Sequence, residues 1–142
     1  PDDPRFLALA RLERYAAPRA VKVESSRGGP QDQLAVGLLR FELLGAPCSL
    51  EAYAEGDDAG QLFLVFRDQS STGPDAQSYG AGRFLSAVVL PGDQVVLDFN
   101  QAWNPLCAYS KYFHCPMPPR QNHLPLAILA GEKAYPHPGG GH

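Results

Sequence analysis

The sequence is poor in several kinds of residue, and each shortage excludes a class of protein. Charged side chains make up 19% of the 142 residues and leave a net charge of −3, which offers no basic surface for nucleic acid. No apolar run approaches the roughly 20 residues that a membrane-spanning helix needs. The chain is nevertheless long enough to bury a core without disulfide staples. These limits leave a soluble globular protein, with neither nucleic acid nor a membrane as a partner.

The first residues also lack the features of a secretory signal. The stretch PDDPRFLALARLERY has no charged start, no long apolar middle and no small-residue cleavage site. We therefore expect a cytoplasmic protein.

Glycine and proline, in contrast, are abundant. Each occurs 14 times among the 142 residues, which is about 10%, whereas average proteins contain roughly 7% glycine and 5% proline. This composition favours an architecture rich in turns, which is typical of β proteins.

The N-terminal residues predict a helix from Pro4 to Ala17. Asp3 can cap this helix, Pro4 suits its first turn, and Pro18 ends it. Its apolar residues fall roughly on one helical face; they are Phe6, Leu9, Ala10 and Leu12.

Downstream of this helix, short alternating or apolar runs separated by turn residues predict strands. The predicted strands are Val21–Ser25, Leu34–Leu43, Ser49–Ala54, Gln61–Arg67, Phe84–Leu90, Gln94–Asn100 and Leu124–Ala130. Because no helical crossover separates them, we expect a mostly-β fold, a small antiparallel β-barrel or sandwich with the one N-terminal helix. Residues 1–135 would form a single domain, and residues 136–142 a disordered tail.

The cysteines allow several interpretations. Cys107 and Cys115, with His114 and His123 nearby, could bind zinc, but their spacing is not that of a tight Cys-x2-Cys knuckle. The alternatives are a disulfide or two small buried thiols. We assign no metal site and keep Cys107 and Cys115 as the alternative. Cys48 is expected to be a buried thiol.

A glycine-flanked segment leads into an arginine. Gly80 and Gly82 free the backbone for close approach to a ligand, and Arg83 offers a planar fork for a carboxylate or phosphate. In the alternative interpretation, the glycines form a bulge and Arg83 pairs with Asp98 or Glu132 on a neighbouring strand. The sequence leaves both open.

The residues after the predicted strand Gln94–Asn100 also allow two interpretations. A buried Asp98 would need a partner such as Arg83, and Asn100 and Asn104 could tie loop backbone down through their side chains. Alternatively, these polar residues and Trp103 line the mouth of a pocket.

Three segments of the C-terminal half resemble one known family. They are YGAGRFL (Tyr79–Leu85), DFNQAWNPLCAYSKYFHCPMPP (Asp98–Pro119) and NHLPLAILAGEKAY (Asn122–Tyr135). In order and spacing they resemble the bacterial domain-of-unknown-function family 1684. The resemblance implies a mostly-β fold and no established activity. It places the family's signature positions at Asp68, Tyr79, Gly82, Arg83, Asp98, Asn100, Asn104, Cys107, Cys115, Pro116, Asn122 and Glu132.

The function expected from these patterns is the binding of a small ligand, with an anion favoured. The predicted ligand-binding residues are Tyr79, Arg83, Asp98, Asn100, Trp103, Asn104 and Glu132. One alternative is an enzyme, a hydrolase or a flavin-dependent oxidoreductase, with Asp98, Glu132 or His123 as the acid or base. Another is a structural or partner-binding domain whose long loop locks the fold. The sequence assigns no catalytic residue and no cofactor.

Overall fold

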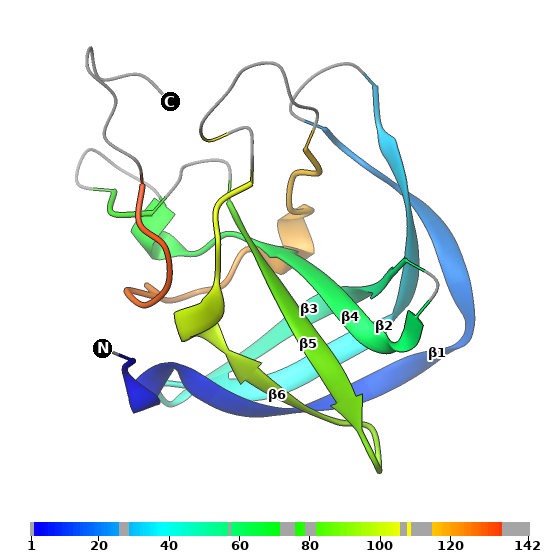
Figure 1. Cartoon of the computed structure of the whole chain (residues 1–142), viewed down its shortest axis with the longest axis horizontal. Helices are drawn as coiled ribbons and strands as arrows, with labels where there is room; N and C mark the ends of the chain where they lie inside the picture. Colours follow the sequence, from blue (N-terminus) through cyan, green and yellow to red (C-terminus); the bar gives the residue numbers. More distant parts are fainter. Residues whose placement is uncertain are drawn as a thin grey trace.

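Six antiparallel strands close into a barrel in the computed structural model (Figure 1). The described residues are 2–25, 29–56, 58–71, 76–78, 82–105, 108 and 115–134. The strands are β1 (Leu7–Val23), β2 (Gln31–Leu43), β3 (Ala46–Glu55), β4 (Asp58–Phe66), β5 (Arg83–Leu90) and β6 (Gln94–Asp98). Each strand pairs with the next along the chain, and β6 returns to pair with β1. The predicted antiparallel barrel is therefore confirmed.

Helical structure among the described residues is limited to single 3₁₀ turns. These turns are η1 (Pro4–Phe6), η2 (Gln69–Ser71), η3 (Phe99–Gln101) and η5 (Arg120–Asn122). Within the described ranges, none of the helices has the length and apolar character needed to cross a lipid bilayer.

The predicted helix Pro4–Ala17 is wrong, since only its first residues form the turn η1. The rest belongs to β1, in which the buried Ala8 and Ala10 alternate with Leu7 and Leu9, which are 48% and 63% exposed. Successive side chains of a strand point to opposite faces, so the period is two. The sequence alternates in side-chain size rather than in polarity, and this concealed the period.

The predicted strand Leu124–Ala130 is also wrong. The segment 115–134, orange to red in Figure 1, runs from beside the end of β1, past the end of β4, toward the N-terminal end of the chain without joining the sheet as a strand. Its ladder contacts are two isolated bridges, an antiparallel one between Ser25 and Pro116 and a parallel one between Arg67 and His123. The apolar residues that suggested a strand include Leu124 and Ile128, which are buried in the main core.

The remaining predicted strands are confirmed, although the one predicted as Gln94–Asn100 ends at Asp98 and continues as the turn η3. Leu44 and Gly45 connect β2 to β3, and Pro91–Asp93 connects β5 to β6. The predicted strand Val21–Ser25 is the far end of the long β1. The predicted tail, residues 136–142, lies outside the described residues, and the single-domain assignment stays a prediction.

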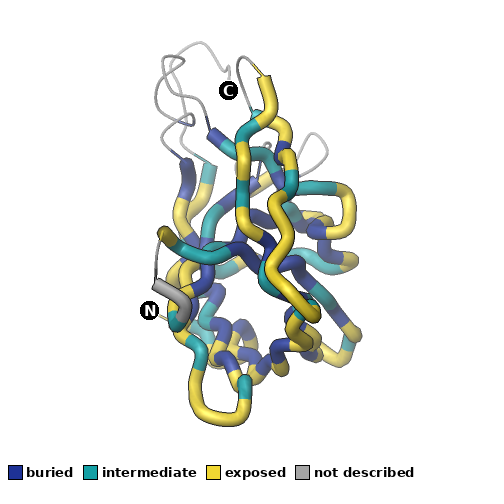
Figure 2. Tube along the Cα trace, turned by 90° about the vertical axis from the view of Figure 1, so that its right-hand side faces the viewer, coloured by how far each residue is buried: buried dark blue, intermediate teal, exposed yellow. Residues whose placement is uncertain are grey.

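Two apolar clusters pack on opposite faces of the strands, and buried and exposed positions alternate along the trace in Figure 2. The main core fills the barrel; its largest fully buried members are Leu39, Leu43, Leu50, Leu62, Leu64, Phe66, Leu85, Leu97, Phe99 and Ile128. We call the smaller group the outer cluster: Val23, Ala35, Tyr53 and Val65, with Tyr15, Val21, Phe63 and Phe84 packed against it. On β4 the alternation of Leu64 and Phe66 with Phe63 and Val65 assigns the two clusters to opposite faces.

A close approach of two backbones fixes the bend of β1 against β2. Gly37 pairs with Arg14 just before an irregularity in the ladder. A Cβ atom at Gly37 would lie 2.4 Å from the Glu13 carbonyl oxygen. Only glycine allows this contact.

We predict that Gly37→Ala destabilises the protein by about 1–3 kcal/mol, because the backbone of β1 must shift to admit the methyl group. Urea denaturation followed by circular dichroism measures the loss. Gly29→Ala is the control, since nothing lies within 4 Å of a Cβ atom at Gly29. Equal stability of the two variants would contradict this account of the bend.

Candidate functional site

The predicted anion-binding arginine forms a buried ion pair. Arg83 is 0% exposed, and its Nη2 donates to Asp68 Oδ2 at 3.0 Å. Asp68 Oδ1 accepts from the backbone amides of Ser70 (2.8 Å) and Ile128 (3.1 Å) and from the Ser70 hydroxyl. These donors, together with Arg83, satisfy the hydrogen-bonding capacity of the buried carboxylate.

The guanidinium of Arg83 is also bonded to the C-terminal segment. Nη1 donates to the carbonyl oxygens of Ala130 (2.6 Å) and Glu132 (3.2 Å), and Nη2 to that of Ile128 (2.9 Å). The pairing of Arg83 with the Asp98 or Glu132 side chain is therefore wrong, because the partner is Asp68. These contacts match the structural interpretation of Arg83. Gly82, which precedes it, has φ +103° and a Cβ there would lie 2.7 Å from the Phe66 carbonyl oxygen.

Asp98 and Asn100 fix the N-terminal residues. The Asp98 carboxylate caps η3, accepting from the Asn100 backbone amide at 3.0 Å and from its Nδ2 at 2.9 Å. The Asn100 side chain accepts from the backbone amide of Asp3 at 2.8 Å and donates to the Asp3 carbonyl at 2.9 Å. The Asn100 side chain thus bonds both the amide and the carbonyl of Asp3, as the backbone of a neighbouring strand would.

Asn104 and Glu132 form a second contact of this kind. The Glu132 carboxylate accepts from the backbone amide of Asn104 at 2.7 Å, and Asn104 Nδ2 donates to the Lys133 carbonyl at 2.9 Å. These bonds tie the segment after η3 to the C-terminal segment. They are the loop contacts that the structural interpretation of the asparagines predicts.

Asn122 bridges two strands that separate. Tyr53 of β3 pairs with Phe63 of β4. If the ladder continued for two more residues, Glu51 would pair with Val65. There the Asn122 side chain accepts from the Glu51 amide (2.8 Å) and donates to the carbonyls of Glu51 (3.1 Å) and Val65 (2.9 Å). It is fully buried and replaces the missing ladder bonds.

The other predicted residues differ in how far they can be placed. Trp103 is 37% exposed, bridges to Phe84 and packs edge-on against its ring at 6.0 Å. Tyr79 and Cys107 lie outside the described residues. Of the other cysteines, Cys48 is buried and free, as predicted, and Cys115 is disulfide-bonded. A sulfur in a disulfide is not available as a metal ligand, and the described residues contain no cluster of metal-ligating side chains.

A polar group lies within the outer cluster. The Tyr15 hydroxyl donates to Glu51 Oε2 at 2.5 Å, and the Arg19 guanidinium lies 3.9 Å from the centre of the Tyr15 ring. Tyr53 is 0% exposed, and its hydroxyl has no hydrogen-bond partner among the described residues. Burial is the main cause that raises the pKa of both phenols, and the neighbouring Glu51 raises them further.

A small cleft opens between the end of β4 and the C-terminal segment. It has a volume of about 180 Å³ and is lined by Arg67, Asp68, Gln69, His123 and Leu124. Backbone bonds hold its two sides together: Arg67 donates to Asn122 at 3.1 Å, and Leu124 donates to Arg67 at 2.7 Å. Arg67 Nε is buried without a partner among the described residues.

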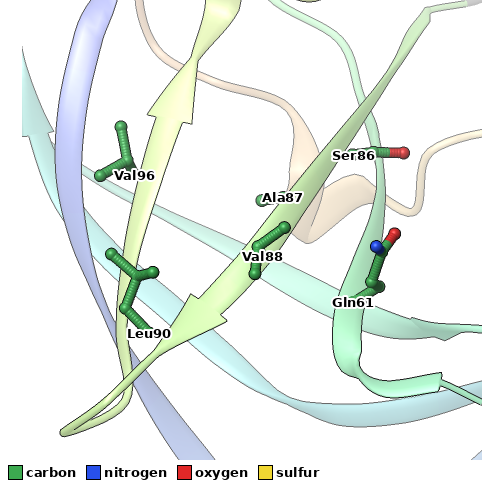
Figure 3. Close-up of a pocket in the computed structure, with 6 residues that line it drawn as sticks. All are labelled: Gln61, Ser86, Ala87, Val88, Leu90 and Val96. Carbon is green, nitrogen blue, oxygen red and sulfur yellow. The ribbon is translucent and has the colours of Figure 1, made fainter.

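Three depressions are larger than this cleft. A depression of about 390 Å³ is lined by Leu9, Ala10, Arg11, Arg40, Gly92 and Gln94. Two others differ from it in their lining. One, of about 370 Å³ on the outside of β4, β5 and β6, is lined by Val88, Leu90 and Val96 with Gln61 and Ser86, and it has no charged side chain (Figure 3). The other, of about 360 Å³, contains Asn100 and Lys133 beside Asp2 and Asp3. Burial lowers the pKa of Lys133.

Sequence reasoning did not single out Arg67, Glu51 or Tyr53, whose polar groups lie at partly or fully buried positions in the structure. Each occurs in a predicted strand, where alternation alone does not show which face carries a polar group. A charged or hydroxyl group between apolar residues, as in SLEAY and FLVFR, was the available signal.

Comparison with known proteins confirms the resemblance and extends it. A family model described as "Protein of unknown function (DUF1684)" matches residues 1–133. A solution NMR structure of an uncharacterized protein from the gene locus rrnAC0354 of Haloarcula marismortui is similar, with a TM-score of 0.74 and 38% sequence identity over 92% of this chain and 72% of that chain. A search of curated proteins found no match.

We predict that Asp68→Asn lowers the free energy of unfolding by about 3–5 kcal/mol, because it leaves Arg83 as an uncompensated buried charge. Asp98→Asn is the matched control, since asparagine caps a helical turn about as well as aspartate. Urea denaturation of both variants measures the difference. Equal losses would contradict the assignment of the buried pair.

We also predict a pH dependence from the raised phenol pKa values. The unfolded phenol of Tyr53 ionises near its ordinary pKa of 10.0, and the folded one ionises higher. Its contribution to stability is therefore complete below pH 10 and is lost as the pH rises through the folded pKa. Denaturation midpoints from pH 8 to 11.5 should fall less steeply in Tyr53→Phe than in wild type. Parallel profiles would show that the phenol is not desolvated.

Proposed function

The chain belongs to the DUF1684 family of proteins of unknown function, and we propose that it binds a small oxyanion in the cleft between Arg67 and His123. The single observation that carries the proposal is the Arg67 guanidinium. It has no ion pair or hydrogen bond among the described residues, and its Nε is buried. Arginine stays charged in proteins, and a partly buried charge is costly unless it is paired. An anion in the cleft would supply the partner.

The other polar groups of the cleft support an anion rather than a cation. The Asp68 carboxylate is neutralised by Arg83 at 3.0 Å, so it adds little negative charge. Gln69 Nε2 donates to the Pro125 carbonyl at 3.0 Å. The exposed His123 imidazole lines the same cleft and supplies a second donor.

Size and donor geometry favour a small ligand. A volume of about 180 Å³ has room for a single phosphate, sulfate or carboxylate group, since a water molecule occupies about 30 Å³. The planar guanidinium suits two parallel bonds to such a group. The bridge between Arg67 and His123 holds the two donors on adjacent backbones.

This proposal keeps the predicted class of ligand, a small anion, but assigns it to Arg67 instead of Arg83. Ligand contact at Arg83 stays a prediction, but the terminal nitrogens of Arg83 are already bonded within the fold. Of the three predicted acids or bases, Asp98 and Glu132 likewise accept bonds from backbone amides. The hydrolase and flavin-dependent alternatives would then depend on His123, which lines the cleft.

The cytoplasmic location and the bacterial origin also stay predictions. The disulfide at Cys115 favours an oxidising compartment over the cytoplasm, because cytoplasmic thiols are kept reduced.

We predict that inorganic phosphate binds wild-type protein and that Arg67→Gln abolishes this binding without unfolding the barrel. Isothermal titration calorimetry with phosphate, sulfate and acetate at low ionic strength measures the affinity. Bound phosphate should also raise the melting temperature of wild type, because a ligand of the native state stabilises it by mass action.

Arg120→Gln is the matched control. It removes the same charge three residues before His123, from an exposed side chain that does not line the cleft. Phosphate affinity should persist in this variant. Equal loss in both variants would indicate only a general charge effect, and no binding to wild type would overturn the proposal.

A further inference from the structure

Five large apolar side chains point outward from one face of the barrel, and we call them the aliphatic face. They are Leu7 and Leu9 of β1, Val88 and Leu90 of β5, and Val96 of β6, and each is between 42% and 63% exposed. They make up more than half of the exposed large apolar residues in the described part of the chain. A contiguous apolar patch on a protein surface marks an interaction site, whereas exposed apolar residues scattered singly do not.

Strand pairing makes the aliphatic face continuous. Leu9 is opposite Val96 across β1 and β6, and the pairing of Val89 with Val95 places Val88 beside Val96. The other two members lie two residues away along β1 and β5, so they point to the same side of the sheet. One apolar surface therefore spans three neighbouring strands.

The surface around these side chains is hollowed. Val88, Leu90 and Val96 line the depression of about 370 Å³ on β4, β5 and β6 (Figure 3). Leu9 lines the depression of about 390 Å³ on the other side of β6, together with Arg11 and Arg40. Both have room for side chains of a partner, and none of these residues lines the Arg67–His123 cleft.

Opposite charges border the aliphatic face at its two ends. Arg11 and Arg40 are opposite each other on β1 and β2, at the end near the β5–β6 turn. Asp98 is opposite Leu7 at the other end, and Glu42 lies two residues from Arg40 in that direction. The face is thus positive at one end and negative at the other, so it complements a copy of itself that is turned end to end.

The area of the face is that of a protein interface. From their exposed fractions, the five side chains present roughly 400 Å² of apolar surface, within the range of the largest patches on monomeric proteins. The polar and charged residues around them about double this area, which reaches the ~800 Å² that each partner buries in a standard interface. An apolar centre with a charged rim is also the usual composition of such interfaces.

We propose that the aliphatic face is the interface of a homodimer, with a two-fold axis that runs perpendicular to the strands. This axis packs the aliphatic side chains of the two copies together and brings Arg11 of one copy toward Asp98 of the second copy. Arg11 carries this contact because Arg40 is paired with Glu13 of its own chain at 2.7 Å. In such an isologous interface the same contact occurs twice.

The charges select this axis over the other one that would pack the two faces together. A two-fold axis parallel to the strands would place the arginine-bearing ends of both copies at the same edge of the interface, where like charges repel. The dimer does not require the oxyanion site, so either proposal can fail alone.

Sedimentation velocity of the whole chain from about 1 to 500 µM tests the dimer. We expect wild type to dimerise with a dissociation constant in the micromolar range. Leu9→Glu should raise this constant at least tenfold while leaving the melting temperature nearly unchanged, because Leu9 is 63% exposed in one copy. Leu34→Glu is the matched control, since Leu34 is an exposed leucine of β2 outside the aliphatic face, and it should dimerise as wild type does.

Arg11→Glu tests the direction of the axis. It should raise the dissociation constant at least tenfold, since it places a second negative charge near Asp98 of the other copy. A tighter dimer in this variant would contradict the perpendicular axis, because the parallel axis would relieve a repulsion there. A monomeric wild type at every concentration, or equal dimerisation of wild type and Leu9→Glu, would overturn the proposal.

Discussion

The buried ion pair between Asp68 and Arg83 connects the end of β4, the start of β5 and the C-terminal segment, and the rest of the structure depends on this connection. Asp68 follows β4, Arg83 begins β5, and the guanidinium reaches the carbonyls of Ile128, Ala130 and Glu132. Desolvating two charges is expensive, and mutual attraction offsets the cost only when the remaining donors and acceptors are also bonded. The fold supplies most of those bonds, so the irregular C-terminal segment has a fixed place beside a regular barrel.

Asparagine side chains extend the same principle to places where the sheet ends. An amide group carries one donor and one acceptor side, as the backbone does. Asn100 uses both on Asp3, and Asn122 uses both on Glu51 with a further bond to Val65. Unusual polar residues can therefore be required by the fold alone. Groups that remain without partners among the described residues and that line a cleft, such as the Arg67 guanidinium, are better indicators of binding.

The sequence predicted the barrel because alternation and turn residues are local signals. It failed at β1, where alanine and leucine alternate. Because both are apolar, the sequence did not show that the alanines face the core and the leucines face outward. It also failed for Leu124 and Ile128, whose burial comes from packing against the main core rather than from strand pairing. Strand alternation predicted a buried Asp98 with Arg83 as its partner, whereas Asp98 is half-buried and Arg83 pairs with Asp68 across 15 residues of chain, which local sequence signals do not show.

A double-mutant cycle on Asp68 and Arg83 tests the central claim most directly. The free energy of unfolding would be measured for wild type, Asp68→Asn, Arg83→Met and the double variant. We predict a coupling energy of at least about 2 kcal/mol, because either single change leaves its partner buried and unpaired whereas the double change does not. Additivity within about 0.5 kcal/mol would show that the pair does not hold the C-terminal segment to the barrel.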